Sequence, residues 1–129
     1  MSRFAEWQSR TLGALAERLV VATGGRCEDV TDMRVCRCGR IRWYGRGGTQ
    51  WGDCFVTAGD AAAPGRALLA HERHHRDAQW RRHGWAFGLM YVAAECWDVW
   101  LRRRPCNRYE RAAEDASDGG GGYPPEPPR

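Results

Sequence analysis

Residues 71–75 of the chain read His-Glu-Arg-His-His, which matches the pattern H-E-x-x-H. On a helix, side chains four positions apart lie on one face, so His71 and His75 can present two imidazole nitrogens to one point. Zinc prefers nitrogen, sulfur and carboxylate ligands in a tetrahedron, and a catalytic zinc keeps one position for water. Glu72 lies about 100° further round the helix, where it can hold that water but is badly placed to be a ligand. The pattern therefore predicts a zinc site with Glu72 as general base.

The alternative is an accidental match on a solvated helix. Leu68, His71 and His75 follow the spacing of a half-buried helix face, so the histidine pair is expected to point inward. A buried imidazole pair without partners costs free energy, whereas a metal ion satisfies both nitrogens. The spacing therefore favours metal ligation.

Two carboxylates near the end of the chain compete to be the third ligand. Glu110 and Glu114 are one helical turn apart and share a face. Asn107 and Glu110 also have the spacing of a capping box, but Asn107 can cap the helix by itself. We favour Glu110 as ligand and predict that Glu114 accepts a hydrogen bond from a ligand histidine. Four residues are candidate donors to the oxyanion that hydrolysis would create, and the sequence does not choose among them: His74, His83, Tyr91 and Tyr109.

The elements that must position these residues follow an α+β order. Apolar residues at helical spacing predict a helix over residues 1–25. A small antiparallel sheet of two or three strands is expected within residues 26–57. Residues 58–118 are predicted to form the metal-binding helices: the H-E-x-x-H helix, a second long helix over about 85–103 and a short helix that carries Glu110. The β-like stretches on which the sheet prediction rests are 30–38, 41–44 and 51–57.

Length and composition set the outer limits. The 129 residues suit a single domain, predicted over 1–118, and 43% hydrophobic residues with seven Trp indicate a folded protein. Residues 119–129 are rich in Gly and Pro and are predicted to be a disordered tail. The net charge of +4 comes from arginine alone and is spread along the chain. Because nucleic acids prefer clustered basic faces, a nucleic-acid partner is not favoured.

The sequence also leads to expectations about location and thiol state. The N-terminal region lacks an uninterrupted apolar segment of the kind found in export signals. The most apolar run, 85–94, is much shorter than the ~20 residues that a bilayer span needs. A cytoplasmic protein with no membrane partner is therefore expected. In that compartment the six cysteines are expected to be reduced thiols.

Over residues 51–123 the sequence resembles the small bacterial gluzincin-type zinc metallopeptidases. The resemblance implies a minimal zincin-like domain with His71, His75 and Glu110 as zinc ligands and Glu72 as catalytic base. One departure from the family pattern is that Gln79 and Trp80 lie one residue further from His75, which predicts a bulged or differently ended helix. The motifs that carry the resemblance are His71-Glu72-x-x-His75, Gln79-Trp80-x-x-x-Gly84, a helix with Phe87 and Tyr91, Asn107-Arg108-Tyr109-Glu110 and the Gly-Gly-Tyr that ends at Tyr123.

Three functions of different classes are compatible with these observations. The favoured one is a zinc-dependent metallopeptidase, with Zn²⁺ as cofactor and a peptide or protein as substrate. The alternative is a catalytically silent zinc-binding zincin-like domain that acts in structure or partner binding. The third is an arginine-rich nucleic-acid module in which the metal motif is accidental.

Overall fold

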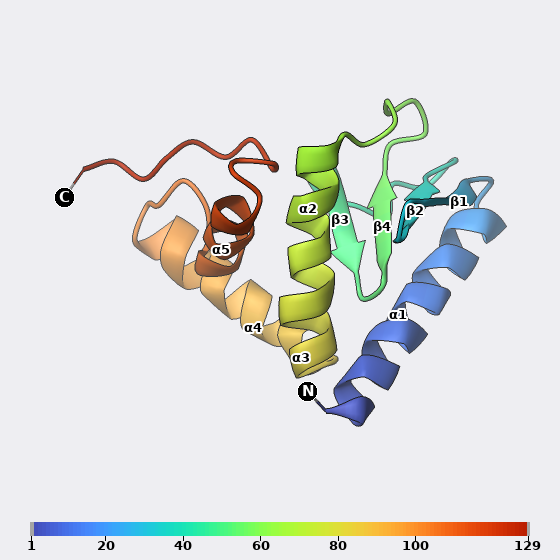
Figure 1. The fold of residues 1–129 in the computed structure, drawn as a ribbon, viewed down its shortest axis with the longest axis horizontal. Helices are drawn as coiled ribbons and strands as arrows, with labels where there is room; N and C mark the ends of the chain where they lie inside the picture. Colours follow the sequence, from blue (N-terminus) through green and yellow to red (C-terminus); the bar gives the residue numbers. More distant parts are fainter. Residues whose placement is uncertain (1, 129) are drawn as a thin grey trace.

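Helices flank a four-stranded sheet in the computed structural model, which describes residues 2–128. This arrangement confirms the predicted α+β class, with an N-terminal helix, a sheet, and then the helices that carry His71, His75 and Glu110 (Figure 1). The elements in chain order are α1 (Arg3–Ala22), β1 (Arg26–Val30), β2 (Met33–Arg37), β3 (Gly48–Trp51), β4 (Cys54–Thr57), α2 (Arg66–His74), the π-helical η1 (His75–Trp80), the short α3 (Arg81–His83), α4 (Ala86–Ala94), the π-helical η2 (Glu95–Leu101) and α5 (Arg108–Ala116).

The sheet is mixed, so the prediction of an antiparallel sheet with two or three strands is wrong in both respects. Its strand order is β1-β2-β4-β3. The β1–β2 and β3–β4 pairs are antiparallel, whereas β2 and β4 run parallel, with Val35 opposite Phe55. After β2 the chain crosses over before β3, and the tight turn at Gly52 returns β4 between β2 and β3. Residues 41–44, which the alternation of apolar and polar residues predicted as a strand, form no strand.

Both faces of the sheet are covered, because successive side chains on a strand point to opposite sides. On one face, Ala16 and Val20 of α1 pack against strand residues 36, 54 and 56. On the other face, Leu69 of α2 packs against Met33, Val35 and Phe55. Figure 1 shows the sheet between α1 and α2. Strand β4 is therefore buried on both of its sides.

The helix with the H-E-x-x-H residues continues without a break from α2 through η1 to α3 and ends at Gly84, where φ is +60°. Next, α4 and η2 form the second long helix, close to its predicted extent. The buried Phe87 on α4 packs edge-on against Trp80 of η1 and Tyr109 of α5, with ring centroids 5.0 and 5.1 Å apart. This aromatic cluster joins the three helices.

Cys27 of β1 and Cys36 of β2 lie opposite each other and form a disulfide bond. The prediction of reduced thiols is therefore wrong for this pair. Disulfides persist in oxidising compartments, so the bond favours an extracytoplasmic location over the cytoplasmic one expected from the sequence. Within residues 2–128, no helix combines the length and hydropathy that crossing a membrane requires.

Replacing Phe87 tests whether the aromatic cluster joins the helices. Phe87 is 2% exposed, so Phe87→Ala leaves a cavity between α4, η1 and α5. We expect a loss of about 3–5 kcal/mol in the free energy of unfolding, measured by urea denaturation. The matched control is Leu89→Ala on the same helix, where the side chain is 80% exposed and the expected change is within ~0.5 kcal/mol. Equal effects of the two substitutions would contradict this description.

Candidate metal centre

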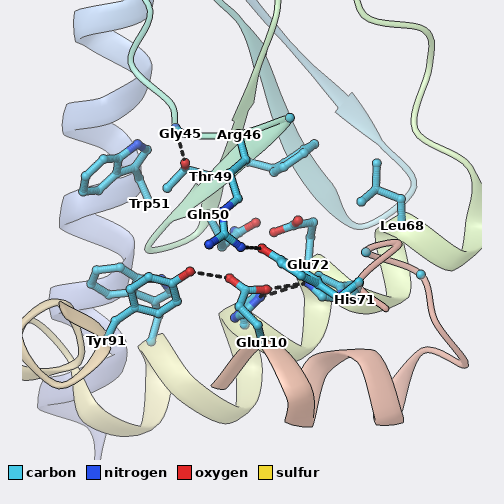
Figure 2. Close-up of a pocket in the computed structure, with 18 of the residues that line it drawn as sticks. Gly45, Arg46, Thr49, Gln50, Trp51, Leu68, His71, Glu72, Tyr91 and Glu110 are labelled. Carbon is cyan, nitrogen blue, oxygen red and sulfur yellow. Dashed lines mark hydrogen bonds and ion pairs between the residues drawn. The ribbon is translucent and has the colours of Figure 1, made fainter. Parts of the chain in front are cut away.

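Three donor atoms meet at one point between α2, η1 and α5. His71 Nε2, His75 Nε2 and Glu110 Oε2 form a triangle in which every side is 3.1 Å (Figure 2). Neighbouring ligands of a tetrahedral ion with bonds of about 2.0–2.1 Å lie roughly 3.3 Å apart. All three side chains are buried, and they form a group that can hold a metal ion.

The local structure of the helix accounts for the position of the histidines. His71 and His75 project from the buried face of the helix, four residues apart. At His75 the helix changes from α-helical to π-helical winding, which accommodates the extra residue between His75 and the Gln79–Trp80 pair. The bulge predicted from this spacing is thus present.

Gln79 orients His75. Its side-chain nitrogen donates to the carbonyl of Tyr109 at 3.0 Å, so its oxygen Oε1 faces His75 Nδ1 at 2.6 Å. An oxygen there accepts a hydrogen bond from Nδ1–H, so in the neutral imidazole Nε2 is the nitrogen that carries the lone pair. The lone pair of Nε2 therefore points to the place where the three donors meet. This role of Gln79 was not predicted from the sequence, although Gln79 lies one helical turn beyond His75.

Glu114 occupies the corresponding position beside His71. Its buried carboxylate oxygen Oε1 lies 3.0 Å from His71 Nδ1, off the line of a well-aligned ring hydrogen bond. The same oxygen accepts the backbone N–H of Gly121 at 2.5 Å. Both histidines therefore have an oxygen near Nδ1 and turn Nε2 toward Glu110. Glu114 is thus close to a candidate ligand histidine, and its predicted hydrogen bond to that histidine stays a prediction.

The start of α5 leaves the Glu110 side chain available. Asn107 Oδ1 accepts the backbone N–H groups of Tyr109 and Glu110, so Asn107 caps the helix alone. Glu110 Oε1 accepts a hydrogen bond from the hydroxyl of Tyr91 at 2.5 Å, while Oε2 faces the histidines. Burial alone would raise the pKa of Glu110, but the hydrogen bonds with His71 and His75 hold it well below its usual range. Glu110 is thus a carboxylate.

Glu72 lies beside the three donors and lines the cavity in front of them. Burial raises its pKa to about 7, because desolvation outweighs the opposing effect of His75 and His71. A carboxyl group with a pKa near neutrality can both accept and release a proton under ordinary conditions. Its position is therefore suitable for a general base.

The cavity has a volume of about 820 Å³, within the range of small-molecule and peptide-binding pockets. Apolar side chains of the sheet and of α4 form part of its wall, including Trp51, Phe55 and Val92. Among the four predicted oxyanion donors, only Tyr91 lines this cavity. His74 and His83 lie outside the lining, and the ring of Tyr109 packs against Phe87 instead.

The segment 119–123 packs against the site, although the sequence placed it in the disordered tail. The ring of Tyr123 stacks on that of His71 at a centroid distance of 6.3 Å, and its hydroxyl accepts a hydrogen bond from Arg46. Arg46 also pairs with Glu95 of η2 at 2.9 Å. A Cβ atom on Gly121 would lie 2.5 Å from the His71 ring, so only glycine fits there. Apart from the Gly-Gly-Tyr motif in the family resemblance, no signal in the sequence pointed to these contacts.

Comparison with protein-family models, with curated proteins and with solved structures finds no match for this chain. The resemblance to zincin-like sites therefore rests on the geometry of the site itself. A buried pair of histidines from one helix and a glutamate from a later helix is the arrangement that the H-E-x-x-H resemblance implied.

Substitution of the two glutamates tests which one is the ligand. We expect Glu114→Ala to weaken zinc binding by about 10- to 100-fold, the range for a residue that orients a ligand. Glu110→Ala should weaken it more, because this change removes a donor atom. Zinc affinity is measured by competition with a chromophoric chelator, with Asp115→Ala on the exposed side of α5 as the control. The reverse ranking of the two glutamates would overturn the assignment of Glu110.

Proposed function

We propose that this protein is a zinc-dependent metallopeptidase that hydrolyses a peptide or protein substrate. The observation that carries the proposal is the convergence of His71 Nε2, His75 Nε2 and Glu110 Oε2 beside Glu72, at the wall of a large cavity. Two neutral imidazoles and one carboxylate are the ligand set of many catalytic zinc sites, and they leave a fourth position open.

When bound, zinc would supply a water of lowered pKa and would polarise the scissile carbonyl. Glu72 accepts the proton of the attacking water and delivers it to the leaving amine. Tyr91 is the proposed donor to the developing oxyanion, since it alone of the four candidates reaches the cavity. Its hydroxyl donates to Glu110 in the structure and would turn from there toward the substrate oxygen.

The cavity also offers a way to hold an extended chain. Strand β3 is an edge of the sheet, and all four of its residues line the cavity. The unpaired backbone groups of an edge strand can bind a peptide as an additional strand. We propose that the substrate lies along β3, with its scissile bond near His71 and His75.

The alternative function is a catalytically silent zinc-binding domain. The position of Tyr123 favours this alternative, because its ring stacks on His71 and narrows one side of the site. In that case the metal would join α2 to α5 and stabilise the fold, as structural zinc sites do.

The substitution Glu72→Gln distinguishes the two functions. It keeps the size of the side chain and removes the base, so hydrolysis of a quenched fluorescent peptide library should fall about 10²–10⁴-fold. The zinc content, measured by mass spectrometry of the metal, should stay unchanged because Glu72 is not a ligand. Absence of turnover in the original chain, with zinc bound, would leave only the silent domain, and turnover that is indifferent to Glu72→Gln would overturn the role of Glu72 as base.

A second prediction concerns removal of the metal. Dialysis against a chelator should abolish hydrolysis, and one equivalent of zinc should restore it. His75→Ala is the matched variant, because it removes a ligand and should not recover activity at the same zinc concentration. Hydrolysis that survives complete loss of the metal would contradict the zinc-dependent mechanism.

A further inference from the structure

The helix formed by α4 and η2 exposes a continuous row of large apolar side chains, which we call the outer stripe. In Figure 1, α4 runs along the edge of the molecule, on the other side of α2 from the sheet. From Leu89 to Trp100 the side chains of the stripe recur every three to five residues, and Leu101 adjoins Trp100, so they share one side of the helix. Its members and their exposed fractions are Leu89 (80%), Val92 (60%), Trp97 (54%), Trp100 (70%) and Leu101 (70%).

The polarity of this helix is the reverse of that expected for a helix on a protein surface. Its two acidic residues point inward: Asp98 is 0% exposed, and Glu95 is partly buried. Asp98 accepts hydrogen bonds from the backbone and side chain of Arg108, and Glu95 bonds to Asn107 and Arg46. A surface helix normally turns its charges to water and its apolar residues to the core. The outer stripe therefore indicates an apolar partner outside the described chain.

The apolar surface extends beyond the N-terminal end of α4. Trp85 precedes Leu89 by one helical turn and contacts Trp7 of α1, with ring centroids 5.9 Å apart. Trp7 in turn stacks on Phe4 at 5.6 Å. All three rings are about half exposed or more. Exposed tryptophans at the edge of an apolar surface are typical of proteins that lie at the boundary between lipid and water.

The charges around the stripe identify the partner more closely. Arg82 is exposed near one end of the helix, and Arg102 and Arg103 are exposed at the other end. Of the two carboxylates within residues 81–104, Asp98 is buried and Glu95 is partly buried and paired with Arg46. Pairing of the stripe with a second copy of the chain, in either direction, would bring arginines together. An anionic surface instead attracts the arginines at both ends of the helix.

We propose that this helix binds the surface of a membrane that contains anionic lipids. The outer stripe enters the boundary between headgroups and acyl chains, and Arg82, Arg102 and Arg103 contact lipid phosphates. The helix lies in the plane of the surface and does not cross the bilayer, as an interfacial amphipathic helix does. The expectation of no membrane partner rested on the length that a membrane span needs, which an interfacial helix does not require. This proposal does not depend on the proposed function.

The cavity in front of the candidate metal site lies next to the outer stripe. Val92 belongs to the outer stripe and also lines the cavity in front of the histidines. The neighbouring Tyr91 lines the same cavity. On a membrane-bound molecule the cavity therefore lies beside the lipid surface.

The test is flotation of the full chain with vesicles. We expect it to float with vesicles of phosphatidylcholine mixed with phosphatidylglycerol, and much less with vesicles of phosphatidylcholine alone. The double variant Trp100→Ser/Leu101→Ser should bind the mixed vesicles at least about tenfold more weakly, because both side chains lose their burial in lipid. Arg102→Gln/Arg103→Gln should weaken binding by about tenfold or more and reduce its dependence on salt.

The control variant is Leu15→Ser, since Leu15 is exposed on α1 and lies outside the stripe. It should bind the mixed vesicles like the original chain, and so should Glu72→Gln. Absence of binding to the mixed vesicles would overturn the proposal. It would also be overturned by a dimer in sedimentation experiments that Trp100→Ser/Leu101→Ser dissociates, because a second copy would then be the partner.

Discussion

The candidate site depends on one buried cluster, in which His71 Nε2, His75 Nε2 and Glu110 Oε2 each lie 3.1 Å from the other two. Such a cluster is costly without a shared positive charge, because three acceptor atoms repel one another away from water. Gln79 adds to this cost, because its oxygen beside His75 Nδ1 favours the tautomer in which Nε2 carries no proton. A metal ion satisfies all three donors at once.

The inward-facing acidic residues of the helix α4–η2 help to position one of these three donors. Its inward acids, Glu95 and Asp98, bond to Asn107 and Arg108 at the start of α5. These bonds fix the first turn of α5, which carries Glu110. Acidic side chains that a surface helix would normally turn to water thus help to position Glu110, the candidate ligand on α5. The consequence is a helix with only apolar side chains left for its outer face.

Local spacing in the sequence was sufficient to predict those parts of the site whose residues lie within one or two helical turns of each other. The histidine pair and the cap at Asn107 follow from such short intervals, and the bulge after His75 followed from comparison with the family pattern that the sequence resembles. The mixed sheet could not be predicted, because the insertion of β4 between β2 and β3 depends on contacts distant in sequence. The contacts of Tyr123 with His71 and Arg46 could not be predicted either, because these residues are also distant in sequence. The inward turn of Glu95 and Asp98 was also hidden, since a helix that is apolar on most sides gives no periodic signal for its buried face.

One helix therefore connects the metal site with the outer surface. Tyr91 donates a hydrogen bond to Glu110 on the inner side of α4, and the next residue, Val92, is exposed on the outer side. Consecutive residues of a helix share a rigid backbone, so a shift of the outer face also moves the hydroxyl of Tyr91. Glu95 adds a second connection through Arg46 to Tyr123, whose ring lies over His71. Any partner that fixes the outer face of this helix thereby also fixes the groups that surround the three donor atoms.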